Sequence, residues 1–458
     1  MVFVSDRQAG AKPQSGPGSS LTRVAAADVR VPHARWAIAL AALIVCAALL
    51  YLTRTYTFYF DEWTFITSAP DWALRTYFEP HNEHPVMLLR LVYSILLETA
   101  GLRTYLPYMA ALLLAHAANV LLLFELVRRR AGDLVAMAAA LVMLVLGAGW
   151  EDLLWAFQVG WLSSMAFGLG AVLALERRPA LAAALMTVSL SFAGTGVVFA
   201  VAIAVQLLLT PGRRRDLLWF AAPALALGAW YLAFGRFGEH PNPQPTAANI
   251  LIDPLYALWG LSQGVAGIVG AAGWIGYPLL AVAAVVVTWH WRRGGLDPFS
   301  AGIAAGLLGF FLVAGLTRAQ LGWQQSGASR YVYVAALMWL VLLGDAARLL
   351  PWRGTWRPAI AACIFLVCFN GAVLLFVYAS AKTLQMQRAT ADLQALAAMR
   401  DDPCLDPAGH ADVLIMPGIT PPAYYRAVDR YGDPVAGKPV RDQADFEAAR
   451  SRLRRTNC

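Results

Sequence analysis

An adjacent carboxylate pair, Asp61 and Glu62, lies in a polar segment of residues 54–85 that is rich in Tyr, Phe and Trp. Aromatic side chains favour the interface between a membrane and water. Carboxylates held just above a bilayer can bind a divalent cation or accept a proton from a nucleophile. The pair therefore indicates either cation binding or general-base catalysis, although an ordinary solvated loop can also contain such a pair.

A second polar group, with His81, Glu83 and His84, closes the same segment before Pro85. Imidazole and carboxylate groups this close together suit metal binding or proton transfer near neutral pH. The spacing matches no closed structural zinc site. A divalent cation such as Mg²⁺ or Mn²⁺ is one alternative, and the sequence leaves open whether any metal is required. The candidate ligands for that cation are Asp61, Glu62 and Glu83.

Two later breaks between apolar segments add charged residues. Glu151 and Asp152 stand among Trp and Phe residues, whereas Arg318 and Arg330 flank a short segment rich in Gln and Ser, with Tyr331 following directly. Arginine presents a planar fork of donors that fits phosphate oxygens. The same side chain can also simply reach toward lipid headgroups.

Arg90 interrupts an apolar segment over residues 86–101. A charge in such a position is costly unless it faces a partner or an anionic lipid. We therefore include Arg90 among the candidate binding residues.

The elements that must position these residues are membrane helices. The chain has 458 residues, 59% apolar and 14% charged, whereas an ordinary soluble domain is about 25% charged. Apolar stretches of about 20 residues recur between short polar breaks, which predicts an all-α polytopic membrane protein surrounded by membrane lipids. The formal net charge of +8 does not indicate nucleic-acid binding, because the arginines are dispersed in small clusters at the ends of predicted spans.

Arginine clusters orient the predicted spans, because short arginine-rich loops stay cytoplasmic. The clusters are at 128–130, 177–178, 213–215, 292–293 and 348–357. Placing them and the N-terminus inside predicts about eleven spans in a plasma membrane and an extracytoplasmic C-terminus. The predicted spans are residues 36–53, 106–127, 134–149, 157–175, 179–193, 197–209, 217–234, 275–291, 299–316, 331–347 and 358–378.

Two apolar segments, 86–101 and 255–273, do not fit this alternation. Counting either one alone as a span would turn the downstream arginine clusters outward. We therefore expect both to be helices that lie on or dip into the outer leaflet. The first outer loop, residues 54–105, would then contain juxtamembrane helices.

Both ends of the chain are polar and flank a membrane domain of residues 36–378. Residues 1–35 are rich in Gly, Ser, Pro and Ala, which predicts a flexible cytoplasmic tail. Residues 379–458 are expected to form a small extracytoplasmic region. Cys404 and Cys458 flank it and would pair if it lies outside the cell, or remain two thiols at a frayed end.

Several motifs have a recognisable order. Asp61 and Glu62 open the first outer loop, Glu83, His84 and Pro85 precede an amphipathic segment that ends at Gly101, and the next span closes on Arg128–Arg130. This order resembles the first 130 residues of GT-C superfamily glycosyltransferases, particularly aminoarabinose transferases and protein O-mannosyltransferases. The chain is also similar to a group of largely uncharacterised actinobacterial membrane proteins described as glycosyltransferases. It differs from the usual Lys-Pro-Pro or His-Pro-Pro of the superfamily by reading His84-Pro85-Val86.

The resemblance implies an inverting transfer of a sugar from a polyprenyl-phosphate donor to a cell-envelope acceptor. Asp61 would then be the general base that deprotonates the acceptor hydroxyl. Glu62, Glu83 and Asp152 would orient the acceptor or a divalent ion. His84, Arg318 and Arg330 would neutralise the departing phosphate. The other candidate substrate-binding residues are His81, Arg90, Glu151 and Tyr331.

Two other classes of protein share parts of this pattern. A transporter or flippase of lipid-linked sugars would also be polytopic, but transporters often show internal repeats and ionisable groups at the middle of the membrane. Here no clear repeat is visible and the charges gather at the outer boundary, which favours an enzyme. A noncatalytic partner in envelope synthesis would keep the fold but tolerate loss of Asp61 and Glu62.

Overall fold

The structure of the protein, a computed structural model, describes residues 30–238, 243–348 and 356–458. Over these ranges the chain forms helices without β-strands, and eight helices are long and apolar enough to cross a membrane. Helices suit lipid because they satisfy their own backbone hydrogen bonds. The chain is therefore an all-helical polytopic membrane protein, as predicted. The eight long helices are α1 (Ala34–Leu52), α4 (Leu106–Leu144), α6 (Val159–Leu175), α9 (Leu217–Ala233), α11 (Gly276–Gly294), α12 (Pro298–Arg318), α13 (Ser329–Ala347) and α14 (Trp356–Ala398).

Two predictions concern residues outside the described ranges. Most of the predicted N-terminal tail, residues 1–29, lies outside the described ranges, as does Arg353 of the last arginine cluster.

Two shorter apolar helices, α7 (Pro179–Phe192) and α8 (Val197–Leu209), complete the apolar bundle.

Helix α4 is a hairpin of two arms. Gly132 has φ 81° and ψ 176° inside it, a conformation that only glycine adopts without strain. His116 Nε2 of the first arm lies 3.3 Å from the carbonyl oxygen of Leu144 in the second, although residues this far apart in a straight helix are separated by about 42 Å. The break falls between the predicted spans 106–127 and 134–149.

One end of the bundle collects arginines and is called the basic end. At the turn of α4, Arg130 pairs with Asp297 at 2.5 Å and with Asp345 at 3.0 Å, which joins the start of α12 to the end of α13. Arg213 donates to the carbonyl oxygen of Leu175 at 2.7 Å and so closes the end of α6 there. These clusters from distant parts of the sequence share one end, the arrangement expected if they lie on one side of a membrane.

The opposite end, called the loop end, carries α2 (Asp61–Ser68), α3 (Met87–Thr99) and α5 (Trp150–Leu154). Helix α3 corresponds to the predicted helix over 86–101. Its Tyr93 donates to the carboxylate of Glu62 on α2 at 2.8 Å, so α3 packs beside α2 at the loop end.

Helix α10 (Ala247–Ile268) contains the second segment that did not fit the alternation. Near its start, the side chain of Asn249 donates to the carbonyl oxygen of Leu316 at the end of α12, at 2.9 Å. Near its end, Gly267 packs against Val332 at the start of α13. Both contacts belong to the loop end, so α10 begins and ends on the same side of the bundle. Helix α10 therefore does not run from one end of the bundle to the other.

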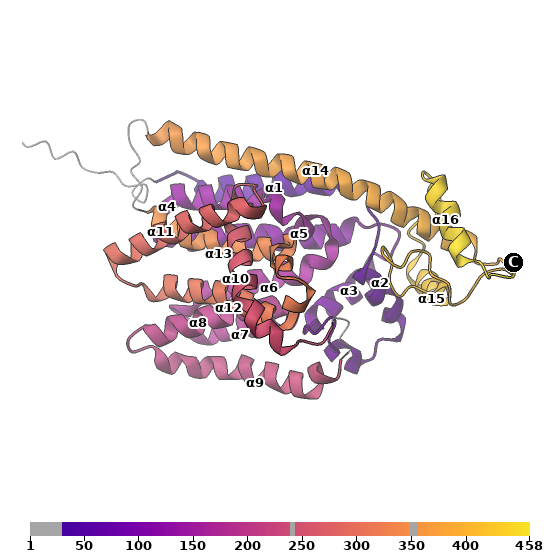
Figure 1. The fold of residues 1–458 in the computed structure, drawn as a ribbon, viewed down its shortest axis with the longest axis horizontal. Coiled ribbons are helices and arrows are strands. Elements are labelled where there is room, and N and C mark those ends of the chain that lie inside the picture. Colours follow the sequence, from indigo (N-terminus) through magenta and orange to yellow (C-terminus); the bar gives the residue numbers. More distant parts are fainter. Residues whose placement is uncertain (1–29, 239–242, 349–355) are drawn as a thin grey trace, which may run out of the picture.

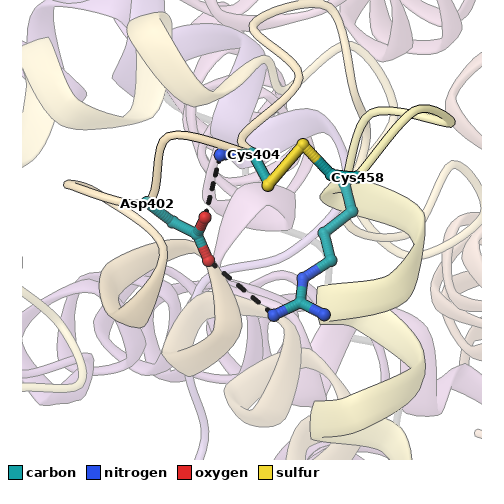
Figure 2. The surroundings of a disulfide bond; sticks show 4 residues. Asp402, Cys404 and Cys458 are labelled. Carbon is teal, nitrogen blue, oxygen red and sulfur yellow. Dashed lines mark hydrogen bonds and ion pairs between the residues drawn. A yellow bond between two sulfur atoms is a disulfide. The ribbon is translucent and has the colours of Figure 1, made fainter.

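The C-terminal region stands on the far end of α14. That helix runs along the bundle and continues past it to α15 (Pro421–Tyr431) and α16 (Gln443–Leu453) (Figure 1). Cys404 and Cys458 form a disulfide, so the paired alternative is the one observed. Beside it, Asp402 accepts the backbone N–H of Cys404 at 2.9 Å (Figure 2). Helix α15 packs on α2, where the rings of Tyr424 and Trp63 lie 5.6 Å apart.

Candidate functional site

A cavity of about 1680 Å³ opens at the loop end. Its wall is built from α2, the segment 79–90, α5, the ends of α12 and α13 that face this side, α14 and residues 414–418. It brings together residues that are separated by hundreds of positions in the sequence. Seven of the predicted site residues line it: Asp61, His81, His84, Arg90, Glu151, Arg318 and Arg330.

Asp61 is the first residue of α2 and faces the cavity. Its Oδ2 lies 3.8 Å from His81 Nε2 and 3.5 Å from Asn82 Nδ2. Across the described residues, neither arginine nor lysine forms an ion pair with Asp61. Its carboxylate is therefore open to a proton or a ligand from the cavity.

The backbone just before Asp61 is held from the C-terminal region. Phe60 has φ 55° and ψ −131°, an uncommon conformation for a residue with a side chain. Its N–H donates to the carbonyl oxygen of Ile415 at 2.8 Å. This contact fixes the start of α2 and with it the direction of the Asp61 side chain.

Glu62 lies behind the cavity wall. Consecutive helical residues point about 100° apart, and the Glu62 side chain is completely buried. Its carboxylate accepts the N–H of Tyr59 at 3.1 Å and the hydroxyls of Tyr93 and Tyr105 at 2.8 and 3.0 Å. Burial raises the pKa of Glu62 to about 8, although these hydrogen bonds act in the opposite direction. Glu62 thus anchors α2, α3 and the start of α4, and the cavity does not reach it.

Arg318 forms the cationic wall of the cavity together with two neutral partners. Its Nη2 donates to His84 Nε2 at 3.1 Å and its Nη1 to the hydroxyl of Tyr331 at 3.3 Å. Burial first, and then the charge of Arg318, lowers the pKa of His84 to about 3. His84 is therefore neutral and holds its proton on Nδ1, because Nε2 accepts from an arginine. Through this hydrogen bond it orients the guanidinium of Arg318.

Arg330 differs from Arg318 because its charge is already compensated. Arg330 Nη1 lies 2.8 Å from Glu151 Oε1. By contrast, no carboxylate in the described part of the chain pairs with Arg318. Of the two predicted phosphate-binding arginines, Arg318 is thus the one whose positive charge is not balanced by a carboxylate of the described residues.

The remaining predicted residues are outside the cavity wall. Asp152 is buried, neither of its oxygens has a hydrogen-bond partner among the described residues, and burial raises its pKa well above the usual range. Glu83 belongs to the turn between His81 and His84 and has φ 71°. Tyr331 lies behind Arg318 and contacts it through its hydroxyl.

Lys382 of α14 also lines the cavity and is not among the residues predicted from the sequence. It is 5% exposed, donates to the Tyr59 hydroxyl, and lies 3.6 Å from the centre of that ring. It forms no ion pair within the described ranges. The available signal was that Lys382 and Lys438 are the only lysines after Lys12.

The wall also contains neutral polar atoms without partners. Three of these atoms are buried and have no hydrogen-bond partner among the described residues: Trp155 Nε1, Gln158 Oε1 and Gln325 Oε1. Donors and acceptors beside aromatic rings suit the hydroxyls and the apolar faces of a sugar ring.

A closed protein site for a metal is missing from the described residues. No group of three or more His, Cys, Asp or Glu side chains could hold an ion there. The predicted ligands Asp61, Glu62 and Glu83 do not form one metal site. The carboxylate of Glu62 accepts hydrogen bonds from the Tyr59 N–H and from the hydroxyls of Tyr93 and Tyr105, behind the cavity wall. A cation at Asp61 would have to take most of its ligands from a substrate or from water.

No family model, curated protein or solved structure matches the chain. The functional argument therefore rests on the geometry of the cavity.

Proposed function

We propose that the protein is an integral membrane glycosyltransferase that moves a sugar from a polyprenyl-phosphate donor to an acceptor outside the cytoplasm. One observation carries the proposal: a single cavity presents both the carboxylate of Asp61, which pairs with no arginine or lysine of the described residues, and the guanidinium of Arg318, which pairs with no carboxylate among them. The first suits a proton acceptor and the second a departing phosphate. The cavity also lies at the end of an apolar helix bundle, where a lipid-linked donor can keep its chain in the membrane.

The reaction would be a single displacement. Asp61 takes the proton of the acceptor hydroxyl, whose oxygen attacks the anomeric carbon from the face opposite the phosphate. The bond from that carbon to the phosphate oxygen breaks, and the polyprenyl phosphate leaves with the electron pair. Arg318, held by His84 and Tyr331, stabilises the new charge, an effect that typically lowers a barrier by about 3 kcal/mol for one preorganised donor.

The proposal includes a membrane topology. We count eleven crossings: the two arms of α4, the other seven long helices, and the shorter α7 and α8. The arginines of the basic end would be cytoplasmic, and the loop end would face outward from the plasma membrane. The disulfide between Cys404 and Cys458 supports this orientation, because disulfides persist in oxidising compartments.

Replacing Asp61 with Asn tests the function. We expect transfer from a polyprenyl-phosphate sugar by the purified protein to fall about 10²- to 10⁴-fold, the usual contribution of a general base. The matched control is Asp71→Asn, since Asp71 is an exposed residue outside the cavity. Transfer by the well-expressed Asp61 variant near the wild-type rate would contradict the assignment. Because detergent-purified protein has no gradient to use, transfer there also separates the enzyme from a transporter.

A further inference from the structure

Arg90 is a second cation in the same cavity that forms no ion pair with the described residues. It lies on α3, is 7% exposed, and its Nε is buried with no hydrogen-bond partner among those residues. Its guanidinium stacks on Phe65 and Trp72, at 4.6 and 5.4 Å from the ring centres. Glu79 is on the same wall but forms no ion pair with it. Burial lowers the pKa of Arg90 only to about 10, so the side chain remains charged.

The surroundings of Arg90 differ from those of Arg318. Arg318 is held by His84 and Tyr331, whereas Arg90 is held only by aromatic faces. Phe65, which stacks on Arg90, also packs edge-on against His81 at 5.1 Å. His81 lies next to Asp61. Contacts through Phe65 and His81 therefore connect Arg90 to Asp61, and the backbone pairing of His81 with His84 connects the same segment to Arg318.

The wall near Arg90 also contains polar residues. Thr64 and Ser68 follow Asp61 at helical spacing on α2 and line the cavity with it, and Arg75 and Thr76 complete this side. An aromatic cradle fixes the plane of a guanidinium and leaves its edge free for a planar or tetrahedral oxyanion. A buried cation of this kind is costly unless a ligand compensates it.

We propose that Arg90 and Arg75 form a second anion subsite, which binds a phosphate or carboxylate group carried by the acceptor sugar. The assignment of this subsite to the acceptor rests on the proposed function. That function places the donor phosphate at Arg318 and leaves Arg90 for a group of the acceptor. The protein would then select a negatively charged saccharide over a neutral one. The oxyanion would hold the acceptor so that its hydroxyl reaches Asp61.

Binding measurements test this subsite without relying on transfer. The detergent-purified full-length protein is first saturated with farnesyl phosphate, a soluble lipid phosphate, and then titrated calorimetrically with glucuronate, glucose 6-phosphate or glucose. We expect the two anionic sugars to bind at least about tenfold more tightly than glucose, the contribution of roughly one charge-assisted hydrogen bond. Equal affinity for the three sugars would overturn the proposal.

Variants assign the two anions to their subsites. Arg90→Gln should weaken the two anionic sugars about tenfold or more and leave farnesyl phosphate unchanged, whereas Arg318→Gln should do the reverse. Arg236→Gln is the matched control, because Arg236 is exposed at the loop end, stacks on Phe237 and does not line the cavity. If Arg90→Gln weakens farnesyl phosphate instead, Arg90 serves the donor and the proposal is wrong.

Two further comparisons keep the test decisive. Should Arg90→Gln fail to fold, Arg75→Gln at an exposed position must lower affinity for the anionic sugars severalfold, and an unchanged affinity would contradict the subsite. Loss of transfer in Asp61→Asn reports on the proposed function alone, since that variant should still distinguish glucuronate from glucose.

Discussion

Asp61 and Glu62 are neighbours with opposite environments. Asp61 faces an open cavity, whereas Glu62 is surrounded by tyrosines and is uncharged over much of the neutral range because burial raises its pKa to about 8. The sequence predicts that this pair is important, but it does not separate the two roles. Which carboxylate faces the cavity depends on where α2 begins, and that is set by the contact of Phe60 with Ile415, which is far away in the sequence.

The raised pKa of Glu62 predicts how stability depends on pH. The folded protein holds the Glu62 proton up to about pH 8, whereas an unfolded chain releases it near 4.5. The contribution of Glu62 to stability is therefore complete below pH 4.5 and declines as the pH rises toward 8. Glu62→Gln should flatten the fall in melting temperature between pH 5 and 8, measured by thermal unfolding in detergent. An unchanged pH dependence would show that Glu62 is already ionised in the folded protein.

Arg318 and Arg330 should respond differently to loss of charge. Arg318→Gln should lower the transfer rate about 10²- to 10³-fold, because it removes an uncompensated cation from the phosphate. Arg330→Gln should act mainly by leaving Glu151 unpaired. The double variant Arg330→Gln/Glu151→Gln should therefore recover most of the lost activity, as measured by steady-state kinetics. Equal effects of the two single variants, with no recovery in the double, would contradict this distinction.

At the scale of elements, residues 411–418 form a wall that hydropathy does not reveal. Asp412 Oδ1 accepts the N–H groups of Leu414 and Ile415 at 2.7 and 3.0 Å. This turn directs the Ile415 carbonyl toward Phe60 and places Leu414 in the cavity wall. The segment thereby links the C-terminal region to the start of α2.

Asp412→Ala should loosen this wall and reduce transfer about tenfold, because a shift of about 1 Å in a positioned group can cost more than that in rate. Asp406→Ala is the matched control, because Asp406 Oδ1 accepts the N–H of Ala408 at 3.0 Å in a similar turn. Asp406 and Ala408 do not line the cavity. Steady-state kinetics of both variants measure the effect. Equal activities would show that residues 411–418 do not position Asp61.

The elements that could be predicted from sequence are those set by local patterns. The hydropathy of α12 and α13, the break at Gly132 and the short amphipathic α3 follow from residues close together in the chain. Lys382 could not be placed, because α14 extends well beyond a membrane span and only the packed structure brings it to Tyr59. The neutrality of His84 is likewise set by burial beside Arg318, which a one-dimensional pattern does not report.

The whole molecule has a basic end and a loop end, and the C-terminal region closes over the second. Contacts within that region join its two ends. The N–H of Arg455 donates to the carbonyl oxygen of Cys404 at 2.9 Å, and the N–H of Asp406 donates to that of Leu453 at 2.8 Å. The disulfide joins Cys404 to Cys458. The residues that hold Asp61 in place, 411–418, lie inside the loop that this disulfide closes. The stability of the C-terminal region should thus influence a cavity whose chemistry is carried by residues hundreds of positions earlier.

Removing the disulfide tests this connection across the molecule. Closing a loop of 54 residues stabilises a fold by about 4 kcal/mol in the chain-entropy description. Cys458→Ser should therefore raise hydrogen exchange in residues 404–458 and in α2 while the apolar helices stay protected. Transfer should fall in parallel, because the partner of Phe60 becomes mobile. Cys363→Ser, at an exposed free cysteine on α14, should change neither. Faster exchange in the C-terminal region with unchanged exchange in α2 and full activity would show that this region covers the cavity without positioning Asp61.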